Sequence, residues 1–571
     1  MLKITSVNGP IVKAEYKDET PLMFEYVYVG ENRLIGEITS VNKNSVTVQV
    51  YEDTTSLKLN EPVFLTGSLL SATLGPGLLG SVYDGIQRAL FSMPERIQKG
   101  LKTKALDEEK KYFFKALKSA GDEVKKGEII GEVDENGIKH RILSDFDGIL
   151  EEIKDKTCTV KDTVAVISGN RQTMIKKRPL RIPGSFKKRL SPKTPLITGQ
   201  RVIDFMFPIA KGGSASIPGG FGTGKTILQQ TLAKYCDADI IIYIGCGERG
   251  NEMTEVLEEF PKLSDPYSKK PLMNRTVLIA NTSDMPVSAR EASIYLGITI
   301  GEYFRDQGYH VALMADSTSR WAEAMRELSS RMGELPMEEG YPADISSKIA
   351  SVYERASIVQ TFASNTGSLS IIGAVSPAGG DFSEPVTIHT KRFTSVFWAL
   401  DKSLANARFY PAINYLNSYS GYELEEWWEK IGKQKEIKQF FNDILQKDAS
   451  LQKIVKLLGL GALPEEEKIT LYTAELIKEA FLQQNAFDET DAFCTPQKQM
   501  EMAKTVVLIH DMWQKAFLSR QIPADILKNQ PVISEFIRAK YEIPNAKYKK
   551  YRLLRKKIEN FYNEFIKNYG E

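Results

Sequence analysis

The feature that most constrains this 571-residue chain is a glycine-rich loop of the form G-x-x-x-x-G-K-[ST]. Its residues are Gly219, Gly220, Phe221, Gly222, Thr223, Gly224, Lys225 and Thr226. Glycines permit positive φ angles and bring backbone N–H groups close to phosphate oxygens. The lysine can place its charge on the β- and γ-phosphates, and the final hydroxyl can ligate Mg²⁺. The loop predicts a nucleoside triphosphate site at the start of a helix.

A phosphate loop also requires a carboxylate on the Mg²⁺ side. The apolar run 311–315 is predicted as a buried strand, and it ends in Asp316, roughly 90 residues after the loop. A carboxylate at the carboxyl end of a parallel strand lies at the sheet edge where ligands bind. Asp316 is therefore predicted to hold Mg²⁺, partly through water.

Hydrolysis further requires a group that positions and polarises water. A second predicted strand, 240–244, runs into Gly245-Cys246-Gly247-Glu248-Arg249. We predict that Glu248 is the general base or water-orienting residue. Arg249 is predicted as a phosphate ligand, because its guanidinium matches phosphate oxygens, and Lys225 completes the catalytic set. The alternative is that Glu248 and Arg249 form a structural ion pair, and Cys246 is interpreted as a small strand-end residue.

The spacing of apolar and polar residues along the chain predicts a multidomain α/β protein. Residues 1–70 show the short alternating strands of a β-barrel, and 71–110 form a glycine-rich connection with a helical segment. Residues 111–185 resemble an inserted β-rich module. In 186–430 buried strands (240–244, 276–280, 311–315, 368–374) alternate with helices that begin at Thr226, Met253, Ser288 and Ser319. Residues 431–571 have helical spacing and predict a helical bundle. The basic run 176–192 is interpreted as a linker with solvated charges.

Composition narrows the possible functions. The net charge of +2 is too small to indicate a nucleic-acid-binding protein, which typically has a large excess of positive charge. The four cysteines and the four histidines do not cluster, which indicates free thiols and favours Mg²⁺ over a transition metal. The first residues lack the apolar core of a signal peptide, and no apolar run approaches the roughly 18 residues of a membrane span. We expect a soluble polypeptide that reaches a membrane only through partners.

Several motifs together resemble the catalytic A subunit of vacuolar/archaeal-type rotary ATPases. They are 208–226, 245–257, 281–286, 316–324 and 376–385. The resemblance covers nearly the whole chain, from Asn8–Val12 through the inserted module, which the related F-type β subunit lacks. It implies a RecA-like central domain and the same roles for the loop, Glu248, Arg249 and Asp316.

The resemblance also implies residues that the motifs alone do not give. Adenine is expected between two aromatic rings, Tyr410 and Phe493. Thr223 stands where eukaryotic members commonly carry cysteine, which favours a bacterial or archaeal member. Asp344 and the serines that follow it depart from the family pattern at a position of inter-subunit contact.

The partners follow from the resemblance as well. The family implies a non-catalytic B subunit, which alternates with this chain in an A₃B₃ ring and supplies an arginine finger in trans. Such a finger is worth about 10³–10⁵ in rate. Central shaft and peripheral stalk subunits would connect the ring, on the cytoplasmic face of the membrane, to a sector that moves H⁺ or Na⁺. The chain would hydrolyse or synthesise ATP; the sequence names neither the ion nor the direction, and no nucleic-acid partner is expected.

Two other interpretations remain open from the sequence. A homohexameric motor, such as a Rho-like RNA translocase or a secretion ATPase, uses the same nucleotide fold. An RNA translocase requires a basic, aromatic N-terminal face, whereas residues 1–70 are mixed in charge. A non-catalytic nucleotide-binding protein is the other alternative, and intact Lys225, Thr226, Glu248 and Asp316 argue against it.

Overall fold

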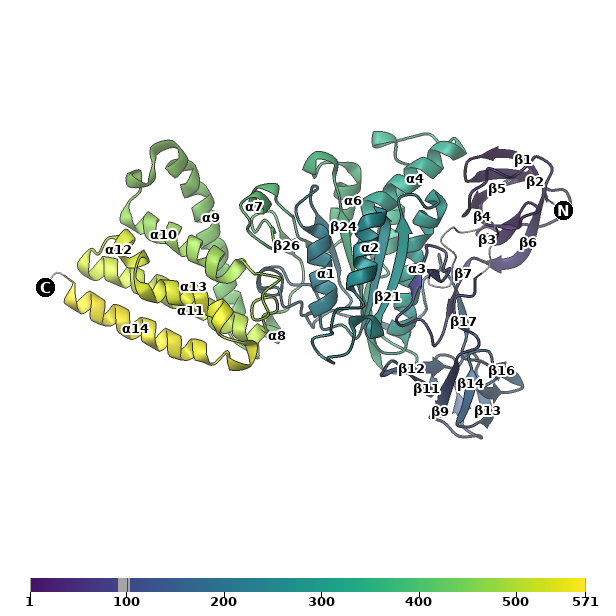
Figure 1. Ribbon diagram of the computed structural model, residues 1–571, viewed down its shortest axis with the longest axis horizontal. Helices are drawn as coiled ribbons and strands as arrows, with labels where there is room; N and C mark the ends of the chain where they lie inside the picture. Colours follow the sequence, from purple (N-terminus) through teal and green to yellow (C-terminus); the bar gives the residue numbers. More distant parts are fainter. Residues whose placement is uncertain (1, 91–99, 101–102, 570–571) are drawn as a thin grey trace. The chain divides into compact units, whose positions relative to one another are not determined.

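The chain folds into two units that are each assembled from separated stretches of sequence. A computed structural model describes residues 2–90, 100 and 103–569 (Figure 1). The first unit comprises Met1–Pro192, Lys211–Pro218 and Ala238–Thr394. The second comprises Lys193–Ala210, Gly219–Asp237 and Ser395–Glu571. The predicted domain boundaries stay a prediction.

The first unit begins with a closed six-stranded barrel. Its strands are β1 (Leu2–Asn8), β2 (Ile11–Glu15), β3 (Glu25–Val29), β4 (Leu34–Val41), β5 (Ser45–Val50) and β6 (Pro62–Leu69), paired in the order β1-β2-β5-β4-β3-β6. Apolar side chains such as Ile4, Val27 and Val48 fill the interior. Closure leaves no unpaired edge, which is how small antiparallel sheets avoid edge-to-edge association.

The predicted β-rich module follows as two four-stranded sheets over a shared apolar core. One sheet pairs β10 (Glu123–Val124), β13 (Gly148–Ile153), β15 (Ala165–Ile167) and β16 (Asn170–Gln172). The other pairs β12 (Ile138–Leu143), β11 (Ile129–Glu135), β9 (Lys111–Ala116) and β14 (Lys156–Thr159). The strands that enter and leave the module, β7 (Ser71–Leu74) and β17 (Lys176–Pro179), pair antiparallel. The helical segment expected in 71–110 falls partly on 91–99 and 101–102, which lie outside the described residues.

A parallel sheet forms the centre of the first unit. Its strands run in the order β19 (Ser214–Pro218), β24 (Thr366–Val375), β22 (His310–Asp316), β20 (Ile240–Glu248), β21 (Thr276–Thr282) and β8 (Val82–Tyr83). Two antiparallel edge strands, β23 (Ser357–Gln360) and β18 (Lys188–Leu190), extend it. Its helices are α2 (Gly250–Glu259), α3 (Val287–Asp306), α4 (Thr318–Met332), α5 (Ile345–Tyr353) and α6 (Pro385–Phe393).

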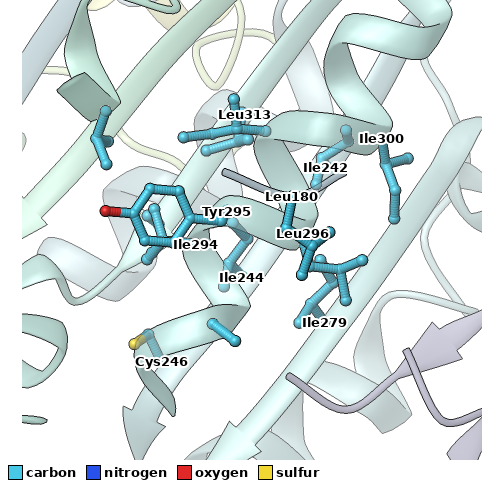
Figure 2. Packing of buried hydrophobic residues seen from close by; sticks show 14 of the residues in the cluster. Leu180, Ile242, Ile244, Cys246, Ile279, Ile294, Tyr295, Leu296, Ile300 and Leu313 are labelled. Atoms are coloured by element: carbon cyan, nitrogen blue, oxygen red, sulfur yellow. The ribbon is translucent and has the colours of Figure 1, made fainter. Parts of the chain in front are cut away.

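Burial on both faces explains why these strands have continuous apolar runs. Ile242 and Ile244 of β20 and Leu313 of β22 pack against α3 (Figure 2). All residues of α3 from Ser288 to Asp306 are buried, including several charged ones. Four of those charged residues have ion-pair partners: Glu291, Glu302, Arg305 and Asp306. Glu302, for example, accepts from Arg355 at 2.6 Å. The alternation of buried strand and helix that the sequence predicts is therefore present.

The second unit combines the phosphate loop with a C-terminal helical bundle. After α1 (Lys225–Tyr235) come the short elements β25 (Val396–Phe397), α7 (Lys402–Asn406), β26 (Tyr419–Ser420) and α8 (Glu425–Glu429). The bundle contains α9 (Gln434–Leu458), α10 (Glu465–Leu476) with its π-helical continuation η7 (Ile477–Leu482), α11 (Pro496–Arg520), α12 (Ala524–Lys528), α13 (Pro531–Glu542) and α14 (Lys550–Asn568). Within the described ranges, no helix has the length and apolarity to cross a membrane.

The basic run 176–192 differs in part from its predicted role. Lys177, Lys187, Lys188 and Arg189 are exposed, as predicted for solvated charges. The run nevertheless contributes β17 and β18, and Arg181 makes ionic contacts with buried carboxylates. The Arg181 guanidinium donates to Glu37 of β4 at 2.8 Å and to Glu291 of α3 at 2.8 Å. Two carboxylates buried in an apolar setting require a nearby positive charge. The residues next to Glu37 and Glu291 in the sequence do not indicate that Arg181 supplies it.

Replacing Arg181 with methionine tests this contact. The variant leaves Glu37 and Glu291 buried without their cation, which typically costs about 3–5 kcal/mol. We expect earlier thermal unfolding of the first unit and faster hydrogen exchange in β4 and α3. Lys187→Met, at an exposed position of the same run, should stay within about 0.5 kcal/mol of the wild type. Equal behaviour of the two variants would contradict a structural role for the Arg181 pairs.

Candidate functional site

The phosphate loop has the geometry that its glycines predict. Gly222 and Gly224 have φ angles of 77° and 88°, in the left-handed region that disfavours other residues. Helix α1 begins at Lys225, one residue before the predicted start. The Lys225 ammonium donates to the carbonyls of Gly219 and Gly220 at 2.6 and 3.0 Å. The lysine is thus folded over its own loop, beside the N–H groups of the first helical turn, where an anion is favoured.

A cavity of about 440 Å³ adjoins this loop within the second unit. It is lined by Thr223 and Gly224 of the loop, by one side of α1, by residues 408, 410–412 and 483–487, and by Gln200 and Leu400. A Cβ atom on Gly224 would lie 3.7 Å from the Tyr410 ring, so the ring is in van der Waals reach of the loop. Apolar walls with an aromatic ring next to a phosphate site suit the base of a nucleotide.

The structure places Tyr410 in the lining of this cavity and Phe493 outside it. Phe493 stacks on Tyr235 with a centroid distance of 5.8 Å, and its ring lies against the face of Gly199. The Cys494 N–H donates to the Gly199 carbonyl at 2.9 Å, which holds the backbone next to Phe493 beside Gly199. The second ring in the lining is instead Phe487, which is 87% exposed.

The acidic residues of the predicted site lie in the first unit, at the carboxyl ends of neighbouring strands. β20 and β22 pair in parallel, with Gly245 opposite Asp316. Asp316 is 3% exposed. Gly247 has a φ of 71° and coincides with a bulge in the pairing of β20 with β21. Such a bulge redirects the side chain that follows it, here Glu248.

The environment of Glu248 changes its acidity. Burial, the charge of Asp316 and a hydrogen bond with Glu252 raise the pKa of Glu248 to about 8, and Arg320 opposes the shift. Two carboxylates at one strand edge disfavour each other's ionised form. A carboxyl group with a pKa near neutrality is suited to general acid–base chemistry.

The structure also gives the surroundings of Arg249, Cys246 and Arg290, which lie on or near β20. Arg249 is exposed at the N-cap of α2. Burial raises the pKa of the Cys246 thiol to about 12, so this cysteine is not a nucleophile at neutral pH. A Cβ atom on Gly247 would lie 3.0 Å from Arg290 of α3, whose Nε has no hydrogen-bond partner among the described residues. The sequence did not single out Arg290, since an arginine inside a helix carries no motif.

The predicted site residues therefore fall into two groups. The loop from Gly219 to Thr226 and Tyr410 belong to the second unit, and Glu248, Arg249 and Asp316 belong to the first. No group of three or more histidine, cysteine or acidic side chains that could hold a metal occurs in the part of the chain that the structure describes.

Comparison with known proteins gives the family. Residues 199–420 match the ATP synthase alpha/beta family, nucleotide-binding domain, and 433–523 match the C-terminal domain of V and A type ATP synthase. Residues 103–181 match the barrel-sandwich domain and 4–67 the β-barrel domain of the same proteins. The A subunit of the A-type ATP synthase from Methanoregula boonei is 50% identical over 97% of this chain and 95% of its own. The V-type ATP synthase alpha chain of Halothermothrix orenii is 49% identical over 100% of this chain and 99% of its own.

The chain belongs to the family of A-type and V-type ATP synthase A subunits. This confirms the predicted fold class of β-barrel, β-rich module, nucleotide-binding α/β domain and helical domain. It also confirms the prediction of an ATP hydrolase or synthase of the V/A type.

A solved structure shares the fold at much lower identity. The assembled ATPase EscN of the type III secretion system from enteropathogenic E. coli has a TM-score of 0.63, with 21% identity, and covers 89% of this chain and 100% of its own. At that identity the likeness shows the fold alone. The A subunits, at about half identity over the full length, decide between the ATP synthase family and a secretion motor.

The raised pKa of Glu248 predicts a pH-dependent stability. In the unfolded chain this carboxyl ionises near its ordinary value of 4.5, and in the folded chain near 8. The folded state therefore binds the proton more tightly, and the associated stability is full below about pH 4.5 and lost as pH rises toward 8. Glu248→Gln removes this loss.

The comparison is made by thermal unfolding of the isolated chain without nucleotide or Mg²⁺. Between pH 5 and pH 8 we expect the melting temperature of Glu248→Gln to rise relative to that of the wild type by about 2 °C or more. Glu255→Gln, which changes an exposed glutamate on α2, the helix that follows Glu248, serves as the control. A difference between Glu248→Gln and wild type that stays constant with pH would contradict the raised pKa.

Proposed function

We propose that this chain carries the catalytic sites of a V/A-type rotary ATPase, with Glu248 as the general base and Lys225 and Arg249 as the γ-phosphate ligands. The observation that carries the proposal is the pair of carboxylates at neighbouring strand ends, Glu248 and Asp316, one of which has a raised pKa. The intact phosphate loop and the high identity to A subunits support it.

The chemistry assigned to Glu248 is proton acceptance. The oxygen of a water molecule attacks the γ-phosphorus, the bond from that phosphorus to the β–γ bridging oxygen breaks, and a proton of the water passes to the ionised carboxylate of Glu248. The higher its pKa, the more strongly that carboxylate holds the proton. Lys225 and Arg249 stabilise the charge on the phosphate oxygens.

Mg²⁺ is the proposed cofactor, held by Thr226 and Asp316, the latter partly through water. A hydroxyl and a carboxylate are hard oxygen donors, which suit Mg²⁺. The Ser317 hydroxyl next to Asp316 is 1% exposed and has no hydrogen-bond partner among the described residues, which fits a site that receives an ordered water. When bound, Mg²⁺ neutralises charge on the phosphate oxygens.

The base of the nucleotide is proposed to lie in the cavity beside the loop. Tyr410 forms one wall, as the resemblance implied, and we assign the second ring to Phe487 in place of Phe493. Loop, α1 and cavity belong to one unit, which supports a continuous path from the base to the phosphates. Gly219 to Gly224, with Lys225 and Thr226, bind the phosphates.

The assembly proposal follows the relatives' names, which describe one component of an ATP synthase. We place the chain in an A₃B₃ ring on the cytoplasmic face of the membrane, with a non-catalytic B subunit that supplies an arginine finger in trans. Shaft and stalk subunits connect the ring to a membrane sector that moves H⁺ or Na⁺. An isolated chain should then hydrolyse ATP slowly, because the finger contributes about 10³–10⁵ in rate.

The catalytic role of Glu248 is tested with Glu248→Gln in the assembled complex. The amide cannot accept the proton, so we expect phosphate release to fall by about 10²–10⁴. ATP affinity should stay within about threefold of the wild type, because the loop and the base cavity are intact. Glu255→Gln should retain full turnover. Unchanged phosphate release from Glu248→Gln would remove Glu248 from the catalytic role.

A further inference from the structure

A third aromatic ring lines the cavity beside the phosphate loop, and it comes from the C-terminal helical bundle. Tyr541 lies in the last turn of α13, is 39% exposed, and forms part of the cavity wall. Tyr410 and Phe487 lie outside the bundle helices, in connecting segments. Cavity, loop and α13 all belong to the second unit.

Lys540, the residue before Tyr541, is buried and binds the backbone of the cavity wall that begins at Gln483. Its ammonium donates to the carbonyls of Glu479 and Gln483 at 2.7 and 3.2 Å, and it is 2% exposed. It also lies 5.0 Å from the centre of the Tyr541 ring, a distance at which a cation is attracted to an aromatic face. Lys540 therefore connects the ring on α13 with the segment 483–487, which lines the cavity.

The position of these contacts has a physical reason. Helix η7 ends at Leu482, directly before the cavity wall, and the last carbonyls of a helix lack partners inside the helix. Arg201 donates to the carbonyls of Phe481 and Gln483 at 2.5 and 2.6 Å. Lys540 donates to the carbonyl of Glu479 and also to that of Gln483. Two buried cations thus cap this helix end, where positive charge is favoured.

The wall is held from its other side as well. The Gln484 amide donates to the carbonyls of Gly199 and Asp491 at 2.8 and 2.7 Å, and its N–H donates to the Tyr410 carbonyl at 2.8 Å. Asp491 accepts from Arg201 at 2.5 Å. Residues 483–484 are consequently fixed in space relative to both Tyr410 and α13.

We propose that the helical bundle takes part directly in nucleotide recognition: Tyr541 is a third aromatic contact for the base, and Lys540 is a positioning residue that holds the wall on which the base rests. This inference rests on the proposed assignment of the cavity to the base of ATP. It extends the binding site from the loop and its neighbours to α13, and it makes base affinity depend on residues of the bundle.

The test compares two probes on the full chain. ATP contains the base and its ribose and inorganic tripolyphosphate contains neither, so the ratio of their dissociation constants, measured by calorimetry with Mg²⁺, reports the nucleoside contacts apart from those of the phosphates. Stacking of a base on an aromatic ring is worth about 1–3 kcal/mol by alanine substitution, which corresponds to roughly 5–150-fold in affinity. We expect Tyr541→Ala to weaken ATP binding about fivefold or more and to leave tripolyphosphate binding unchanged.

Companion variants separate the ring, the hydroxyl and the wall. Tyr541→Phe keeps the ring and should bind ATP within about twofold of the wild type. Lys540→Met should weaken ATP binding but not tripolyphosphate binding, whereas general loss of structure would weaken both equally. Tyr267→Ala removes an exposed tyrosine of the other unit and should change neither probe.

The outcomes distinguish this inference from the one on which it rests. If Tyr410→Ala lowers the preference for ATP over tripolyphosphate while Tyr541→Ala and Lys540→Met behave like Tyr267→Ala, the role of α13 is overturned and the base cavity stands. If neither Tyr410→Ala nor Tyr541→Ala lowers that preference, the base cavity itself is wrong and the inference falls with it. A lowered preference in both tyrosine variants supports the inference.

Discussion

The rest of the structure depends on the burial of the parallel sheet in the first unit. Strands covered on both faces are mainly apolar along their length, so carboxylates are favoured where the strands end. β20 and β22 end in Glu248 and Asp316, and their parallel pairing places both carboxylates at one edge. The raised pKa of Glu248 follows from this arrangement, since burial and a neighbouring negative charge both disfavour its ionised form. Burial of the sheet thus accounts both for the position of the two carboxylates and for the raised pKa of Glu248.

Much of this architecture could be predicted from local sequence. The strand around Ile242 and the strand that ends in Asp316 were predicted from apolar runs, and α1 from the glycine loop, because each depends on neighbours within a few residues. Contacts between distant segments could not be predicted in this way. Arg181 reads as part of a basic linker until the structure pairs it with Glu37 and Glu291. Phe493 lies in a family motif three residues before Pro496, yet its ring lies against Gly199, whose carbonyl accepts from the Cys494 N–H, and Phe487 lines the cavity.

The second unit shows why base recognition was the least predictable part of the site. Its cavity is lined by segments from six regions of the chain: Gln200, the loop with α1, Leu400, residues 408 and 410–412, residues 483–487 and the end of α13. No spacing rule relates Tyr541 to Gly224. The buried cations Arg201 and Lys540 at the end of η7, together with the hydrogen bonds of Gln484, join several of these regions. The proposed phosphate site consists of eight consecutive residues, whereas the proposed base cavity is formed only by the tertiary structure.

The central claim is that this chain is the catalytic member of an alternating ring that operates through other subunits at a membrane. Native mass spectrometry of the complex recovered from host membranes through a tag on this chain tests it most directly. The account predicts three copies of this chain with three copies of a related non-catalytic chain, together with shaft subunits. A ring of six identical copies without such a partner would contradict it and would point to a homohexameric motor on the same fold.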